Sequence, residues 1–379
     1  MKIALNCSYY IPKSGGIKEY IYKLLTNLVS ISLKEGIEYI VYVSPDNYKY
    51  ALETLPKDYR IKKTPFYSKN SIRRSLFENK FYLKEESIEK FDIFHSPFFH
   101  SPKLKKAKII ITVHDLRLYR YPKTYSFFRY IFLKYKVKES VRRADAIIAI
   151  SYFTKQELIL LCHAESEKIT VIHQAIDRNL FSANTINNYE PDLPSEIKSG
   201  EYILSIGHLE PRKNYDNLIY AFNRINNKNI KLVIAGQKNH RYNKTLNLIR
   251  QNENIYYLEF VDLRLLLWLY NNAKLFVFPS IYEGFGLSPL EAASLGTVSA
   301  VSNTSSIPEV CGDSVYYFNP FNINDIVNTI NLLLNDENKI KEKHEKLETH
   351  LNNFSLEKNA EETLKLYKRI ENECCKIMT

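Results

Sequence analysis

The sequence has 379 residues, of which 45% are hydrophobic and 25% charged, and this composition is typical of a globular protein of about two domains. Its clean apolar runs fall far short of the ~18 residues of a membrane-spanning helix, and its N-terminus lacks a signal-peptide pattern, so we expect a cytoplasmic protein. The net charge of +11 lies in the first half, because residues 1–180 carry 32 Lys and Arg against 18 Asp and Glu, whereas residues 181–379 carry 21 against 24. A basic half suits a nucleic acid, an anionic membrane surface or an anionic substrate.

The first 180 residues alternate between strand and helix patterns. Apolar runs predict strands at 3–7, 39–43, 61–64, 93–95, 109–113 and 146–149, with helical patterns between several of them. The loop after the first strand contains Gly15 and Gly16, and apolar residues at helical spacing follow it, which places this glycine pair at a helix N-terminus. A doubly wound parallel sheet is the simplest assembly of such an α/β pattern.

Two polar residues, His114 and Asp115, directly follow the strand predicted at 109–113. Ligands of open α/β sheets bind at the carboxyl ends of the strands, so His114 is a candidate site residue. The alternative is a purely structural histidine at the end of a strand.

Positive charge is densest at 125–143, where six Lys and Arg are interspersed with aromatic residues. If this segment is a helix, its composition suits an interface with anionic lipid. The alternative is an ordinary surface helix whose basic face is solvated.

A polar stretch at 181–200, rich in Asn, Ser and Pro, has no periodicity and is predicted to link two domains. A second βα series follows it. Strands are predicted at 202–206, 231–235, 255–258 and 275–278, and helices at 323–334, 340–351 and 356–374.

The loop after the strand at 202–206 begins with Gly207 and carries Arg212 and Lys213 to the start of a predicted helix. A guanidinium and an ammonium beside free helical N–H groups suit a diphosphate. Two solvated loop cations are the alternative.

A second loop follows the strand at 275–278, where Glu283 and Glu291 bracket a turn that contains Gly284 and Gly286. Glycine lets the backbone approach a ligand that a Cβ atom would push away. Short glycine motifs are common, so an ordinary βα loop with two surface glutamates is the alternative.

These motifs together resemble the retaining glycosyltransferases of family 4, which have the GT-B fold. The segments EGFGLSPLEA from Glu283, GHLEPRKN from Gly207 and HDL from His114 each look like elements of that family, and Glu283 and Glu291 meet its E-x7-E spacing. The resemblance covers nearly the whole chain and is densest at 202–320. It implies two Rossmann-like domains that face each other across a cleft: an acceptor-binding domain at 1–180 and a nucleotide-sugar-binding domain at 201–355, with a final helix at about 356–379 that crosses back to the first.

The resemblance also implies roles for individual residues. Glu283 would lie beside the donor sugar, Glu291 would bind the ribose, and His114, positioned by Asp115, would contact the transferred sugar. Lys213 matches the family lysine that grips the diphosphate, and Arg212 takes the guanidinium role because this chain has His208 where many members have Arg. The implied catalytic residues are Glu283, His114, Arg212 and Lys213, and the implied donor-binding residues are Gly16, Gly207, Arg212, Lys213, Val261, Gly284, Phe285, Gly286, Leu287 and Glu291.

The expected activity is retaining transfer of a sugar, such as mannose, from a nucleotide diphosphate sugar to a hydroxyl of a glycan or polyprenyl-linked acceptor in surface polysaccharide biosynthesis. The sequence has no Asp-x-Asp, and its five cysteines lack a C-x-x-C pair, so we expect neither a metal nor a cofactor. We also expect no nucleic acid partner, and the basic half would bring the enzyme to the inner face of the membrane. Two alternatives are a nucleotide-sugar epimerase on the same fold and a basic nucleic-acid-binding protein.

Overall fold

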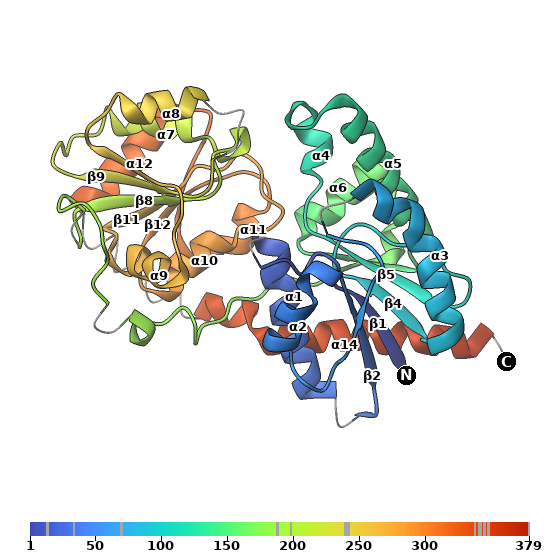
Figure 1. Cartoon of the computed structure of the whole chain (residues 1–379). Coiled ribbons are helices and arrows are strands. Elements are labelled where there is room, and N and C mark those ends of the chain that lie inside the picture. Colours follow the sequence, from blue (N-terminus) through green and yellow to red (C-terminus); the bar gives the residue numbers. More distant parts are fainter. Residues whose placement is uncertain are drawn as a thin grey trace. The chain divides into compact units, whose positions relative to one another are not determined.

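The computed structural model describes residues 1–12, 15–32, 35–68, 71–186, 189–197, 199–238, 243–336, 339, 343, 346 and 349–377. The chain divides into two compact units, and each is built around one sheet (Figure 1). The first unit comprises Met1–Ala175 and Leu356–Thr379, and the second comprises Ile176–Ser355.

The first unit contains a seven-stranded parallel sheet in the order β3-β2-β1-β4-β5-β6-β7. Its strands are β1 (Lys2–Asn6), β2 (Glu38–Val43), β3 (Arg60–Lys63), β4 (Ile93–Ser96), β5 (Lys108–Val113), β6 (Ala146–Ala149) and β7 (Ile169–Val171). Its helices are α1 (Gly16–Ser32), α2 (Tyr48–Thr54), α3 (Ser71–Glu89), α4 (Arg117–Arg120), α5 (Phe127–Arg143), α6 (Tyr152–Cys162) and α14 (Leu356–Ile377).

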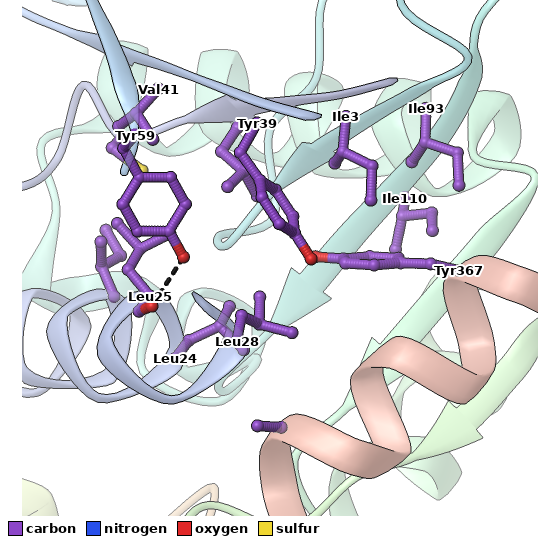
Figure 2. Close-up of a cluster of buried hydrophobic side chains, with 14 of the residues drawn as sticks. Ile3, Leu24, Leu25, Leu28, Tyr39, Val41, Tyr59, Ile93, Ile110 and Tyr367 are labelled. Carbon is purple, nitrogen blue, oxygen red and sulfur yellow. Dashed lines mark hydrogen bonds between the residues drawn. The ribbon is translucent and has the colours of Figure 1, made fainter. Parts of the chain in front are cut away.

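Helices cover both faces of this sheet, and strand β5 shows why. Ile110 belongs to a buried cluster with residues of α1 and α14, whereas Ile109 and Ile111 belong to a cluster with residues of α5 and α6. Successive side chains of a strand point to opposite faces, so a strand covered on both sides is apolar throughout. Figure 2 shows the first cluster, in which the hydroxyl of Tyr59 donates to the backbone oxygen of Leu25 at 2.6 Å.

The last helix, α14, packs against α1 in the first unit. Its Tyr367 is fully buried in the same cluster (Figure 2), and the Tyr367 hydroxyl lies 2.6 Å from Nδ1 of His95 on β4. Nε2 of His95 lies 2.9 Å from the hydroxyl of Thr112 on β5. Burial lowers the pKa of His95 to about 3, so this histidine is neutral and links the last helix to two central strands.

The second unit contains a six-stranded parallel sheet in the order β10-β9-β8-β11-β12-β13. Its strands are β8 (Tyr202–Ile206), β9 (Lys231–Ala235), β10 (Ile255–Leu258), β11 (Leu275–Phe278), β12 (Ser299–Ser302) and β13 (Tyr316–Phe318). Its helices are α7 (Tyr215–Phe222), α8 (Asn243–Arg250), α9 (Leu263–Asn272), α10 (Leu287–Ser294), α11 (Ile307–Cys311) and α12 (Ile323–Asn335).

In each sheet the strand order reverses direction at one point. In the first sheet this switch lies between β1 and β4, and in the second it lies between β8 and β11. The loops after two such neighbouring strands diverge to opposite faces and leave a crevice, which is where open α/β sheets bind ligands. The predicted doubly wound α/β fold is confirmed, and its switch points indicate where to look for a site.

The predicted strands are present, and three short ones were missed, namely β7, β12 and β13. The segment 181–200, predicted as a linker, belongs to the second unit instead. Phe181 is buried there, with its ring centroid 6.4 Å from that of Tyr270, and Gly200 N–H donates to the backbone oxygen of Asn272. Most of the helix predicted at 340–351 lies outside the described residues.

Candidate functional site

The switch point of the second sheet brings together the two loops that the sequence singles out. The loop after β8 contains Gly207 and a 3-10 turn, Pro211–Lys213, and the loop after β11 contains Glu283. The backbone N–H of Ile281 donates to the backbone oxygen of Arg212 at 2.7 Å, which ties one loop to the other. Arg212 and Lys213 therefore lie at the carboxyl edge of the sheet, directly before α7.

Arg212, Lys213 and Glu283 form one cluster of charges. Nη1 of Arg212 lies 2.6 Å from Oε2 of Glu283, and Nζ of Lys213 lies 2.7 Å from Oε1, so the carboxylate bridges both cations. A second carboxylate, Glu210, accepts a hydrogen bond from Nε of Arg212 at 2.8 Å. Nζ of Lys213 also lies 4.6 Å from the centroid of the Phe278 ring, a cation–π distance.

The cluster is buried, since Lys213 and Glu283 are each only 8% exposed. Burial alone would raise the pKa of Glu283, but the charges of Arg212 and Lys213 outweigh it and lower that pKa to about 2. Burial lowers the pKa of Lys213, the charge of Glu283 opposes this shift, and the charge of Arg212 adds to it. A single carboxylate holds the two cations in place, and a larger anion can bind both cations at the point where this carboxylate lies.

Two glycines give Lys213 room to reach the cluster. Gly207 has a φ of +147°, and a Cβ atom there would lie 2.8 Å from Cε of Lys213. Gly236, which follows β9, has a φ of +144°, and a Cβ atom there would lie 2.3 Å from the backbone oxygen of Gly207. The hydroxyl of Tyr215 donates to that same oxygen at 2.9 Å and holds the loop in this conformation.

Two serines hold the loop that carries Glu283. The backbone N–H of Glu283 donates to the Ser305 hydroxyl at 3.0 Å, and the Ser306 hydroxyl donates to the backbone oxygens of Glu283 and Phe285 at 2.9 and 2.8 Å. Ser305 itself has a φ of +56°, an uncommon conformation for a residue other than glycine. The position of Glu283 is thus set by the segment between β12 and α11, whose serines were not predicted as site residues.

The rest of the predicted donor-binding loop leads into α10. Gly286 has a φ of +97° and precedes the first helical residue, Leu287, while Gly284 and Phe285 are buried. Glu291, one turn into α10, accepts a hydrogen bond from the buried hydroxyl of Tyr270 at 3.0 Å. The two glutamates of the E-x7-E motif thus have different partners, two cations for Glu283 and a phenol for Glu291.

Val261, one of the residues implied to bind the donor, lies between β10 and α9 and is half-buried. The next residue, Asp262, caps α9 by accepting from the backbone N–H of Leu265 at 2.9 Å. This strand end is on the same carboxyl edge of the sheet as the charged cluster.

His114 and Gly16 belong to the first unit, where α1 connects their surroundings. Gly16 is the first residue of α1, and Tyr20, one turn later, packs its ring edge-on at 4.8 Å from that of His114. Nε2 of His114 lies 2.9 Å from the backbone oxygen of Pro97 and must carry the proton, since a carbonyl only accepts. Nδ1 then accepts from the side-chain amide of Gln174 at 3.0 Å.

His114 is therefore a neutral, well-positioned imidazole. Burial lowers its pKa, while its bond to Pro97 and the charge of Asp115 act in the opposite direction. The expectation that Asp115 positions His114 is wrong, because Asp115 accepts from the backbone N–H of Arg117 at 3.1 Å and Gln174 holds the ring instead.

Within the described residues, no group of three or more His, Cys, Asp or Glu is arranged to hold a metal ion. No helix in that part of the chain is both long and apolar enough to cross a membrane.

Two parallel-sheet units with these strand orders match the GT-B class of fold. Sucrose-phosphate synthase from Thermosynechococcus elongatus has the same fold, with a TM-score of 0.76 at 16% identity over 98% of this chain and 99% of that one. The complex of Anabaena Alr3699/HepE with UDP and glucose gives a TM-score of 0.72 at 15% identity over 97% of this chain and 100% of that one.

The chain belongs to the glycosyltransferases, since the model of "Glycosyltransferase Family 4" matches residues 14–180 and that of "Glycosyl transferases group 1" matches residues 193–350. Among curated relatives, the O-antigen chain mannosyltransferase B of Escherichia coli is 29% identical over 241 residues, which are 62% of this chain and 63% of that protein. The match thus spans less than two thirds of that relative. The predicted family and fold are confirmed.

Proposed function

We propose that the chain transfers a sugar, with retention at the anomeric carbon, from a nucleotide diphosphate sugar to a hydroxyl acceptor. The observation that carries this proposal is the pair of cations, the partly buried Arg212 and the buried Lys213, aimed at one point at the switch of the second sheet. In this proposal they bind the donor diphosphate, Glu291 binds the ribose and Glu283 lies next to the sugar.

The chemistry requires charge stabilisation more than it requires a strong base. The bond between the anomeric carbon and the diphosphate breaks, a bond from that carbon to the acceptor oxygen forms, and the acceptor proton is released. The leaving diphosphate gains negative charge, which Arg212 and Lys213 stabilise because they are already in position before the bond breaks. Such preorganised donors are each worth about 3–4 kcal/mol of transition-state stabilisation in other enzymes.

Glu283 has two functions in this scheme. Before the donor binds, its carboxylate neutralises Arg212 and Lys213, which would otherwise repel each other. When the diphosphate takes its place on the cations, the carboxylate becomes available to the sugar, where it can stabilise positive charge at the anomeric carbon. His114 of the first unit contacts the transferred sugar in the same proposal, with Gln174 fixing its tautomer.

We propose a GDP-mannose-like donor and a glycan or polyprenyl-linked acceptor of a surface polysaccharide. The support is the relative named as an O-antigen chain mannosyltransferase, together with the family of the chain. The complex of the Anabaena protein with UDP and glucose supports a nucleotide-sugar donor.

A panel of nucleotide sugars tests the proposal by product analysis. Release of free nucleoside diphosphate, together with a glycosylated acceptor whose anomeric configuration matches the donor, is expected. Isomerised nucleotide sugar without free diphosphate would instead indicate an epimerase. Activity is expected to persist in excess chelator, because Arg212 and Lys213 supply the positive charge; complete loss that magnesium or manganese restores would contradict this.

A further inference from the structure

Helix α5 exposes an unusual number of large apolar side chains. Phe127, Phe128, Ile131 and Tyr135 are 71%, 85%, 49% and 61% exposed. With 3.6 residues per turn, these four and Lys138 fall within one sector of about 100° around the helix. The buried residues of α5, Val137, Ser140 and Val141, lie on the other side. A contiguous exposed apolar patch of this kind marks an interaction surface.

Positive charge surrounds this patch. Residues 116–143 contain nine Lys and Arg and one acidic residue, Glu139. Glu139 pairs with Arg142 and Arg143 at 3.1 and 3.0 Å. Positive charge is thus in excess along α5.

The cations of α5 differ in whether they already pair with a carboxylate. Lys136, one of the six predicted to form the basic patch, points instead to the buried carboxylate of Glu78 on α3, at 3.6 Å. In the part of the chain that the structure describes, Arg129, Lys134 and Lys138 have no carboxylate partner. Nζ of Lys134 lies 5.5 Å from the centroid of the Tyr130 ring, and the helical period places this lysine about 20° from Phe127, at the edge of the patch. Arg129 lies 5.9 Å from the centroid of the Tyr125 ring, and the same period places it about 100° from Phe128, outside the patch.

We propose that this surface of α5, formed by Phe127, Phe128, Ile131, Tyr135 and Lys138 with the neighbouring Lys134, docks on an anionic lipid bilayer. The aromatic rings would enter the boundary between headgroups and acyl chains, and the cations would lie at the lipid phosphates. Charge complementarity favours this occupant, because an aromatic patch with cations around it matches the two layers of an anionic membrane surface. The inference goes beyond the proposed activity and does not depend on it.

Co-sedimentation of the full chain with vesicles tests the electrostatic part. Vesicles of phosphatidylcholine alone are compared with vesicles that also contain phosphatidylglycerol, at 0.1 M and 1 M salt. We expect binding to the anionic vesicles only, and release at high salt as the Debye length falls from about 10 to about 3 Å. The variant Lys134→Glu/Lys138→Glu should bind at least about tenfold more weakly, since each cation near the surface adds measurably to binding. Lys49→Glu/Lys57→Glu, with the same change of charge at exposed positions of the same unit, should bind like the wild type.

A tryptophan reporter tests insertion. The chain has a single tryptophan, Trp268, which lies in the second unit. Phe128→Trp should show a blue-shifted emission when anionic vesicles are added, whereas Phe321→Trp, at a residue that is 64% exposed in the second unit, should not. Equal shifts, no shift at position 128, or unchanged binding by the α5 variant would overturn the proposal. A protein that does not bind vesicles but self-associates, and loses self-association in the variant Phe128→Ser/Ile131→Ser, would also overturn the proposal. The occupant of the surface would then be a second copy of the chain.

Discussion

Glu283 and Glu291 share a sequence motif, but their surroundings differ. Glu283 bridges Arg212 and Lys213, whereas Glu291 accepts from the Tyr270 hydroxyl. We predict that Glu283→Gln lowers kcat by about a hundredfold, as loss of one preorganised electrostatic group does elsewhere, and also lowers donor KM, because the carboxylate that competes with the donor diphosphate is gone. Glu291→Gln should instead raise donor KM by about tenfold through a weakened ribose hydrogen bond, and leave kcat near its original value. Steady-state kinetics with the donor varied would contradict the assignment if both variants changed only KM.

The charge cluster also predicts how stability depends on pH. The pKa of Glu283 is about 2 in the folded chain and near 4.5 in the unfolded chain, so its stabilisation is complete above pH 4.5 and is lost as the pH falls toward 2. A difference of this size corresponds to about 3 kcal/mol. Urea unfolding between pH 6 and 3 should therefore show a steeper loss of stability in the wild type than in Glu283→Gln. Parallel curves for the two proteins would show that Glu283 has an ordinary pKa.

Sequence reasoning found individual residues of the site but not the contacts between them. Arg212, Lys213 and Glu283 stand out by residue type and by position at strand ends. Their direct ion pairs were not predicted, because these depend on two loops that are about seventy residues apart in the sequence. Gln174 and Ser306 escaped notice because a single amide or hydroxyl in a loop has no distinctive pattern.

Among the elements, β8 and β9 are each followed by a glycine that leaves room for the loop of Lys213. Gly207 lies against the Lys213 side chain, and Gly236 lies against the backbone of Gly207. Gly207→Ala would push against the flexible end of the Lys213 side chain, whereas Gly236→Ala would push against the backbone of Gly207. We predict that Gly236→Ala costs about 3 kcal/mol or more of unfolding free energy, as severe backbone strain does. Gly207→Ala should cost less stability but weaken donor binding. Urea unfolding and donor titration of both variants check this, and a reversed order of stabilities would contradict it.

The strands that were not predicted from the sequence are short and show no hydrophobic periodicity. Strand β12 has the sequence SAVS and is fully buried, so neither alternation nor an apolar run marks it. Strands β7 and β13 have only three residues each. Longer strands such as β5 were predicted because a run of Ile and Val between polar loops is a strong signal for a buried parallel strand.

At the scale of the whole molecule, the C-terminal helix is part of the first unit. The resemblance to family 4 glycosyltransferases implied that the last helix crosses back to the first domain. No residue pattern predicted this, because α14 shows an amphipathic face but not what that face covers. We predict that Tyr367→Ala lowers the unfolding free energy of the first unit by about 3–5 kcal/mol, the usual cost of truncating a buried aromatic residue. Tyr367→Phe should cost about 1–3 kcal/mol, because Nδ1 of the buried His95 loses its partner.

Hydrogen exchange resolved by peptide checks this prediction. Protection should fall in β4, α1 and α14 of the Tyr367→Ala variant and remain unchanged in the strands of the second unit. Uniform loss of protection in both units, or none in either, would contradict the placement of α14.

We propose above that Arg212 and Lys213 form the diphosphate site and that Glu283 occupies it before the donor binds. Calorimetric titration of a nucleoside diphosphate in excess chelator measures this site without the rest of the reaction. Lys213→Ala and Arg212→Ala should each weaken binding by about tenfold or more, since each removes a charge-assisted contact, and Lys228→Ala, at an exposed position of the same unit, should have no effect. Glu283→Gln should bind the diphosphate more tightly than the wild type, because it removes the competing carboxylate. If the cation variants bind like the wild type, or Glu283→Gln binds more weakly, the account is wrong.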